Sequence, residues 1–151
     1  MTQTLSLPCL VFLTIFAQVA YAADPIVEAK QLFERYVSLS AQFDPAVADL
    51  YADDALIHNK RTYPDGQVRE ITIPALQYKQ LLREVMPLAR ARNDTSTYSK
   101  TTFKVEGMGV RIQAQRFSVM KQYTSPISLR VAPDVTGHWL IREELSESRP
   151  L

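Results

Sequence analysis

The clearest restriction on the fold is a change in the spacing of apolar residues about two-thirds of the way along the chain. From Thr95 onward the segments are rich in threonine, tyrosine, phenylalanine and valine, and apolar and polar residues largely alternate. Such a pattern is typical of strands with one buried face. We therefore predict four strands, at residues 95–106, 110–123, 127–131 and 139–145.

The segments before Thr95 begin with helix-start signals. Asp24-Pro25 and Asp44-Pro45 each place an aspartate before a proline, which suits the N-cap and first turn of a helix. A third helix is predicted from Pro74, with apolar residues at helical spacing up to Ala89. Pro87 lies late in that stretch, so we expect a kink or an early end there.

A hairpin separates the second and third helices. Residues 55–63 and 67–72 read as extended segments on either side of the turn Pro64-Asp65-Gly66. The order of elements predicts an α+β domain in which three N-terminal helices pack on a bent, mainly antiparallel sheet. Helices on the concave side of such a sheet would form a cone with an open end, which is a natural ligand site.

One strand has a break in its pattern. Ile112 and Ala114 share one parity, whereas Phe117 and Val119 share the other. Because side chains alternate along a strand, a continuous core face needs one additional residue between the two pairs. We therefore predict a β-bulge between Ala114 and Phe117 that bends the sheet.

Residues 1–22 have the layout of a cleavable secretory signal. They contain an apolar run at 10–17 and the small-x-small sequence Ala20-Tyr21-Ala22, without a charged side chain. The run is too short for a membrane span, which needs about 20 apolar residues. We expect an exported protein, periplasmic or secreted, with one domain at 23–151 and no stable membrane span after cleavage. An uncleaved anchor or a buried helix is the alternative.

The composition excludes several kinds of chemistry. Cys9 lies within the predicted signal and is the only cysteine, so thiolate catalysis and disulfides are excluded from the mature chain. His58 and His138 lie far apart without a ligand motif, so we expect no metal site, and no phosphate loop or dinucleotide fingerprint suggests a cofactor. The net charge of +1 gives no reason to expect nucleic-acid binding.

Two stretches carry a resemblance to a known superfamily. One runs from Phe33-Glu34-Arg35-Tyr36-Val37 to the phrase "LYADDALI" at 50–57, and the other is "HWLIREEL" at 138–145. With these the chain resembles the nuclear transport factor 2-like superfamily, in its SnoaL-like and ketosteroid-isomerase-like branch. The resemblance implies a cone-shaped fold and frequent pairing through the sheet, but that fold hosts isomerases, dehydratases, ligand carriers and dimerisation modules alike.

The same resemblance assigns roles to individual positions. Tyr36 falls where ketosteroid isomerases place a hydroxyl donor for a developing oxyanion. Asn59 falls where they place the aspartate that moves the proton, and an amide cannot replace it in that role. The second acid of those enzymes would lie near Ile127, where this chain has no carboxyl group, and nearby Asp134 belongs to a turn. Isomerase chemistry of that design is therefore not expected.

Five residues are candidates for a ligand pocket, each with a plainer structural reading beside it. Tyr36 would supply a hydroxyl or simply pack in the core, and Arg61 would hold an anion at the mouth or be solvated. His58 has the opposite parity to Asn59, so at most one of them faces the pocket. Trp139 would line the mouth beside His138 or belong to the core. The full candidate set is Tyr36, Ile57, Asn59, Arg61 and Trp139.

Three functions follow from these observations and stay open. The first and favoured one is binding of a small, partly apolar molecule in the cone. The second is an isomerase- or lyase-type enzyme, which requires a general base that the sequence does not place. The third is a homodimer formed through the outer face of the sheet. Asn93 begins a glycosylation sequon that matters only in a host with an endoplasmic reticulum.

Overall fold

The structure is a computed structural model that describes residues 24–149. The predicted signal at 1–22 lies outside these residues. Two α-helices and one 3-10 helix are present, α1 (Pro25–Ala41), η1 (Pro45–Leu50) and α2 (Ala75–Arg92). None of these helices is long and apolar enough to cross a membrane.

Within the described residues, six strands form a single mixed sheet. The strand order is β2-β1-β6-β5-β4-β3, in which β1 and β6 are parallel and every other neighbouring pair is antiparallel. The strands are β1 (Tyr51–Thr62), β2 (Val68–Pro74), β3 (Ser96–Glu106), β4 (Gly109–Ser118), β5 (Tyr123–Pro133) and β6 (Trp139–Ser148). The hairpin predicted around Pro64-Asp65-Gly66 is therefore present as β1 and β2.

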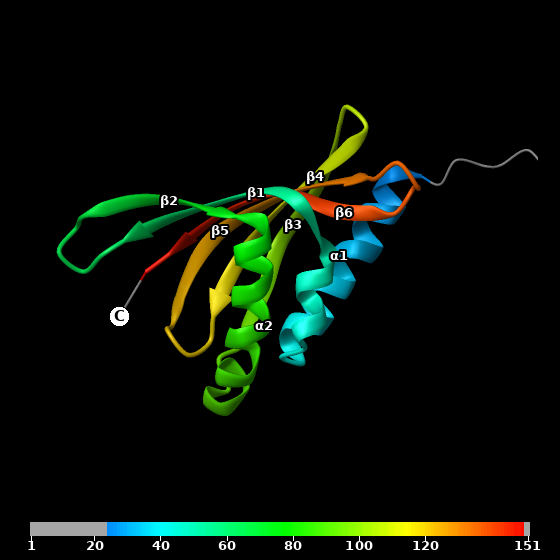
Figure 1. Cartoon of the computed structure of the whole chain (residues 1–151). Helices are drawn as coiled ribbons and strands as arrows, with labels where there is room; N and C mark the ends of the chain where they lie inside the picture. The colour runs from blue at the N-terminus through cyan, green and yellow to red at the C-terminus, as the bar shows by residue number, and fades with distance from the viewer. Residues whose placement is uncertain (1–23, 150–151) are drawn as a thin grey trace, which may run out of the picture.

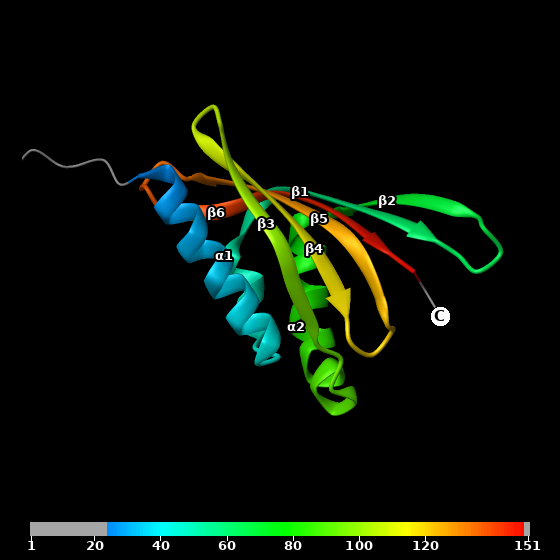
Figure 2. The same ribbon diagram turned by 180° about the vertical axis from the view of Figure 1, so that it is seen from behind.

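All helices lie on one side of the curved sheet, which we call the inner face (Figure 1). Figure 2 shows the same arrangement from behind, with α1 beside β3 and α2 farther along the sheet. The predicted α+β class is confirmed. The finer prediction of three N-terminal helices is not, because only α1 and the short η1 precede the first strand, and α2 follows the β1–β2 hairpin.

Both predicted aspartate caps are present. The side chain of Asp24 accepts a hydrogen bond of 2.9 Å from the amide of Ile26, and that of Asp44 accepts one of 2.9 Å from the amide of Ala46. In each case proline occupies the first turn, where its missing N–H costs nothing.

The early end predicted for the third helix does not occur. α2 continues through Pro87 to Arg92, and Asn93 closes it in the left-handed conformation with φ of 50°. The amide of Asn93 bonds back to the carbonyl of Arg90 at 3.1 Å, as in common helix C-caps. The missing N–H of Pro87 therefore does not end this helix.

The bulge predicted in β4 is also wrong. β4 pairs with β5 in unbroken register from Val110 to Ser118. The irregularity lies in the neighbouring strand, because Ser99 pairs with Gln115 whereas Thr102 pairs with Gln113. The additional residue is in β3, where Lys100 adopts a φ of 53°.

Candidate functional site

The inner face of the sheet changes from apolar to polar toward the end where β1 and β6 finish. Register partners on neighbouring strands define three rows of residues on this face. We call the last of them the rim row. The first row contains Ile57, Glu144, Leu129 and Ile112, and the second Asn59, Ser146, Ile127 and Ala114. The rim row consists of two pairs that continue the same parity, Arg61 with Ser148 and Ser125 with Arg116.

A buried carboxylate stands in the first row. Glu144 is 2% exposed, and its carboxylate accepts hydrogen bonds from the hydroxyls of Tyr51 and Tyr78. The Tyr78 hydroxyl lies 3.2 Å from Oε1 of Glu144, whereas Tyr51 donates to Oε2. These three residues come from β6, β1 and α2, so the carboxylate of Glu144 links two strands and a helix by hydrogen bonds.

A second pair of tyrosine hydroxyls lies between α1 and β3. The hydroxyl of Tyr98 lies 3.5 Å from that of Tyr36, which is the long limit of a hydrogen bond. Their rings meet edge to face, and both pack against Phe33. Because the contact between the hydroxyls is weak, both retain capacity to bond a third polar group.

The bulge in β3 makes this aromatic arrangement possible. Tyr98 and Phe103 have opposite parity, so they would face opposite sides of a regular strand. With the additional residue between Ser99 and Thr102, both rings contact Phe33, at centroid distances of 5.7 Å and 6.2 Å.

The buried tyrosines stay protonated. Burial raises the pKa of Tyr36, Tyr51 and Tyr78 well above the ordinary value of 10.0. The next contribution is the charge of Tyr98 for Tyr36 and of Glu144 for Tyr51 and Tyr78. Burial likewise raises the pKa of Tyr98. At neutral pH the inner face therefore presents hydroxyl donors beside one carboxylate.

Asn59 organises the polar residues of the second and rim rows. Its Nδ2 donates to Oγ of Ser146 at 3.0 Å, and its Oδ1 accepts from Oγ of Ser148 at 2.8 Å. Nε of Arg61 donates to the same Oδ1 at 3.3 Å. Asn59 thus uses both Nδ2 and Oδ1 of its side chain to hold neighbouring residues in place. Its role in the second row is therefore structural.

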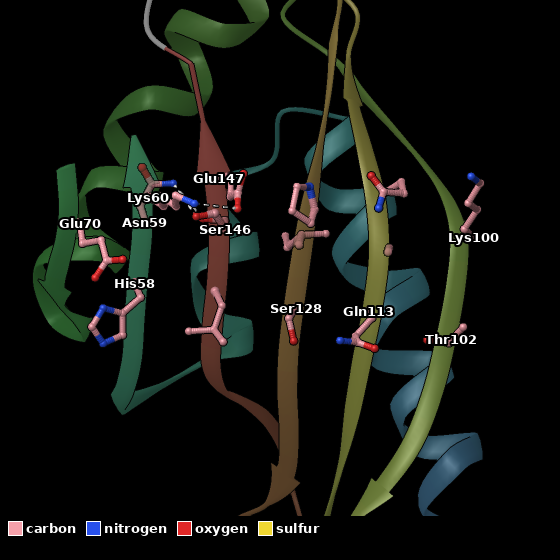
Figure 3. Close-up of a pocket in the computed structure, with 15 residues that line it drawn as sticks. His58, Asn59, Lys60, Glu70, Lys100, Thr102, Gln113, Ser128, Ser146 and Glu147 are labelled. Atoms are coloured by element: carbon pink, nitrogen blue, oxygen red, sulfur yellow. Dashed lines mark hydrogen bonds and ion pairs between the residues drawn. The ribbon is translucent and has the colours of Figure 1, made fainter. Parts of the chain in front are cut away.

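A second hollow lies on the outer face of the sheet, opposite the helices (Figure 3). This groove has a volume of about 620 Å³. His58 projects into it and bonds Thr72, with 3.1 Å between Nδ1 and Oγ1. Asn59 and Ser146 also line this groove, so the statement that at most one of His58 and Asn59 faces a pocket stays a prediction. The groove's other side chains include Lys60, Glu70, Lys100, Thr102, Gln113, Gln115, Pro126, Ser128, Leu145 and Glu147.

The structure places three of the five predicted pocket residues next to one another. Ile57, Asn59 and Arg61 follow one another along the inner face of β1, and Tyr36 packs over the same face from α1. Trp139 is separate, because it begins β6 whereas the partners of Asn59 and Arg61 end that strand. It lines a hollow of about 240 Å³ with His138, beside Arg35 and Glu28.

Sequence reasoning missed two charged residues on the inner face, Glu144 and Arg116. Leu145, the last residue of the strand predicted at 139–145, is 40% exposed and lies on the outer face. The reason is an irregularity in β6, where Val131 pairs with Ile141 but Arg130 pairs with Glu143. The additional residue reverses the parity, so that Ile141 and Glu144 both face inward.

The inward position of Arg116 was missed because the bulge was predicted in β4, whereas it lies in β3. Because β4 is regular, the face of Ile112 and Ala114 continues into Arg116 and buried Ser118. Phe117, which was expected inside, lies on the other face. Unbroken parity from Ile112 would have located Arg116 on the inner face.

Within residues 24–149, no group of three or more histidine, aspartate and glutamate side chains is arranged to hold a metal ion. The inner face instead offers neutral hydroxyls, one buried carboxylate and the guanidinium groups of the rim row. Such groups can bind and orient a polar ligand atom or exchange a proton with it.

The chain is similar to several solved structures. Neither models of protein families nor curated protein sequences match it. Among similar structures is an NTF2-like protein with a cystatin-like fold from Novosphingobium aromaticivorans, at 16% identity, a TM-score of 0.54 and coverage of 82% of this chain and 80% of that one. An NTF2-like protein from Cytophaga hutchinsonii has 10% identity, a TM-score of 0.54 and coverage of 80% and 94%.

A candidate ketosteroid isomerase from Parabacteroides distasonis is also similar, at 12% identity, a TM-score of 0.57 and coverage of 86% of this chain and 92% of that one. Identities this low show the fold alone. The chain therefore has the fold of the nuclear transport factor 2-like superfamily, as its sequence resemblance implied.

Proposed function

We propose that this chain is an exported domain that binds a small, partly apolar molecule at the open end of its inner face. The observation that carries the proposal is the pair of hydroxyls on Tyr36 and Tyr98, only weakly bonded to one another at 3.5 Å. Two neutral donors beside packed aromatic rings are suited to orient one polar atom of an otherwise apolar ligand.

The position of the polar residues supports the same proposal. Asn59 and Ser146 lie in the row next to Glu144, so polarity on the inner face increases toward the rim row. Phe33 and Phe103 fill the other end of the cone with their rings. A ligand would therefore enter from the rim and meet the hydroxyls without displacing the core.

Native mass spectrometry of the protein purified from its own host tests this function. We expect a co-purifying small molecule that is lost on denaturation and is retained less well by Tyr98→Phe. A mature N-terminus at Ala23 in the same spectrum would support export. A protein that carries no molecule and takes up none from a metabolite extract would contradict the binding proposal.

Glu144 favours a second candidate, an isomerase- or lyase-type enzyme. Its carboxylate is the inward acid that a proton-transfer reaction needs and that the sequence did not place. The hydroxyls of Tyr51 and Tyr78 donate hydrogen bonds to it. Its charge also contributes to the raised pKa of Tyr36. Turnover of the co-purifying molecule that Glu144→Gln abolishes, while binding persists, would establish this candidate.

We also propose that the protein pairs with a second copy through the outer face. This face carries both signs of charge, with Lys60 and Lys100 alongside Glu70 and Glu147, so opposite charges can meet across a two-fold axis. Light scattering after size exclusion should give twice the monomer mass. Leu145→Arg should reduce that mass to the monomer value without unfolding the chain, and a monomeric parent protein would contradict the proposal.

A further inference from the structure

Arg116 is a cation on the inner face without an acid beside it. Within residues 24–149, none of its guanidinium nitrogens lies within 4.0 Å of a carboxylate oxygen, although five other cations have such a partner. Its one hydrogen bond there runs from Nη2 to the backbone carbonyl of Glu147, at 3.0 Å. A guanidinium has five N–H donors, so most of this group's donors are uncommitted.

Ser125 is the register partner of Arg116 across β4 and β5. It is 4% exposed, and its Oγ is the buried side-chain oxygen without a hydrogen-bond partner in the described part of the chain. A buried hydroxyl left unpaired costs about 1–3 kcal/mol, so such groups usually have a partner. The Cβ atoms of directly opposite residues in an antiparallel pair are about 5 Å apart. The side chains of Arg116 and Ser125 are therefore neighbours on the inner face.

The neighbouring rim residues do not compete for this position. Oγ of Ser148 and Nε of Arg61 each donate to Oδ1 of Asn59. Ser146 is likewise bonded to Asn59. Among the described residues, Nη1 and Nη2 of Arg61 are also uncommitted, but Arg61 is on β1, which β6 separates from β5. Arg116 is therefore the cation beside the unpaired hydroxyl of Ser125.

We propose that Arg116 and Ser125 form a subsite for the carboxylate group of a small apolar acid. The guanidinium binds the carboxylate with paired N–H donors, and the serine hydroxyl donates to the same group. The apolar part of the acid lies toward Ile127 and Ala114 in the next row and toward the ring of Tyr98. This subsite rests on the proposed binding function and names the class of its ligand.

A carboxylate fits this place better than a phosphate. Glu144 lies near enough to contribute to the electrostatic environment of Arg116, and its negative charge opposes a dianion more than a monoanion. The neighbouring hydroxyls of Tyr36 and Tyr98 are neutral donors, and they can donate to one or two further lone pairs of the ligand's carboxylate. One guanidinium with one hydroxyl matches the two oxygens of a carboxylate.

The experiment compares 1-naphthoate with its neutral counterpart 1-naphthamide, and with acetate and inorganic phosphate. Each is titrated into the purified ¹⁵N-labelled protein while the backbone amides and the arginine Nε–H signals are followed by NMR. We expect naphthoate to shift the Nε–H of Arg116 and to bind about tenfold or more tightly than naphthamide, as a charge-assisted bidentate contact implies. Acetate should shift the same signal at higher concentration.

Variants identify the residues responsible. Arg116→Gln should remove the advantage of naphthoate over naphthamide, and Arg116→Lys, which keeps the charge but not the paired donors, should retain part of it. Ser125→Ala should weaken naphthoate binding about threefold or more. Arg130→Gln is the matched control, because Arg130 is on β5 with the opposite parity to Ser125, and it should change nothing.

The outcomes separate this subsite from the binding function itself. Equal affinity for naphthoate and naphthamide, with shifts at Tyr98, would overturn the subsite and leave the apolar site standing. Phosphate binding as tightly as naphthoate would overturn the carboxylate class. If no carboxylate shifts the Arg116 signal, the subsite fails, and the co-purification experiment then decides on the binding function separately.

Discussion

Tyr51 at the start of β1 donates a hydrogen bond to Glu144 in β6, although 93 residues separate the two in sequence. Both side chains are buried, and Tyr78 of α2 donates to the other carboxylate oxygen at 3.2 Å. A buried carboxylate destabilises the folded state strongly when its oxygens lack hydrogen-bond donors, and much less when donors are present. The stability of the inner face therefore depends on this set of three residues remaining complete.

Glu144→Ala should lower the free energy of unfolding by about 3 kcal/mol, because it leaves two buried hydroxyls unpaired and opens a cavity. Urea unfolding followed by circular dichroism measures the loss. Glu143→Ala is the matched control, since Glu143 pairs with Arg111 on the outer face and its removal should cost about 1 kcal/mol or less. Equal losses in the two variants would show that the buried cluster contributes nothing specific.

The tyrosines of the inner face predict the response to alkali. Their folded pKa values are raised, so the folded state holds protons that the unfolded state releases near pH 10. Stability is thus complete below pH 10 and falls as the pH rises above it. Tyrosinate absorbance at 295 nm should therefore increase together with the loss of circular dichroism, and Tyr51→Phe should reduce that step. Full ionisation in a still folded protein would contradict this account.

The helices and turns could be predicted from the sequence because their signals are local. Asp24 and Asp44 cap helices wherever a proline follows in the first turn, and Gly66 supplies the positive φ of 84° that the β1–β2 turn requires. The superfamily fold followed from a resemblance that also rests on such local phrases. The order of elements was right for the same reason.

The site was only half predictable because the bulges depend on tertiary pairing. A single additional residue in β6 places Glu144 inside and Leu145 outside, and another in β3 lets Tyr98 join the aromatic cluster. Apolar periodicity cannot reveal this, because it assumes that inward positions are apolar. Polar residues were consequently assigned to the surface, whereas Arg116 lies on the inner face.

Lys100 is the residue that the β3 bulge strains. Its φ of 53° is unusual for a side chain with a Cβ and is adopted freely by glycine. Lys100→Gly should therefore be more favourable than the same change in a regular part of the strand. We expect the free energies of unfolding of the two variants to differ by about 1 kcal/mol. Lys104→Gly provides the comparison, because Lys104 lies in a regular part of the same strand.

Deleting Lys100 tests what the bulge achieves. A regular β3 would turn either Tyr98 or Phe103 away from Phe33, so the deletion should cost more than about 3 kcal/mol, as for removal of a large core side chain. Near-ultraviolet circular dichroism would report the altered aromatic cluster. An unchanged spectrum and stability would show that the two rings do not depend on the bulge.

The last prediction separates a ligand contact from a core contact at Tyr36. The side chain is 7% exposed, and its hydroxyl has only the long contact to Tyr98. Tyr36→Phe removes a single weak hydrogen bond and leaves the packed ring in place, so the free energy of unfolding should change by about 1 kcal/mol or less. Affinity for the co-purifying molecule should fall by a larger factor, because that ligand's polar atom loses a donor. Tyr98→Phe and the double variant complete a cycle in which the two effects on affinity should not add, since both hydroxyls address one atom. If Tyr36→Phe instead costs several kcal/mol of stability and leaves affinity unchanged, the hydroxyl belongs to the core and the ligand lies elsewhere on the inner face.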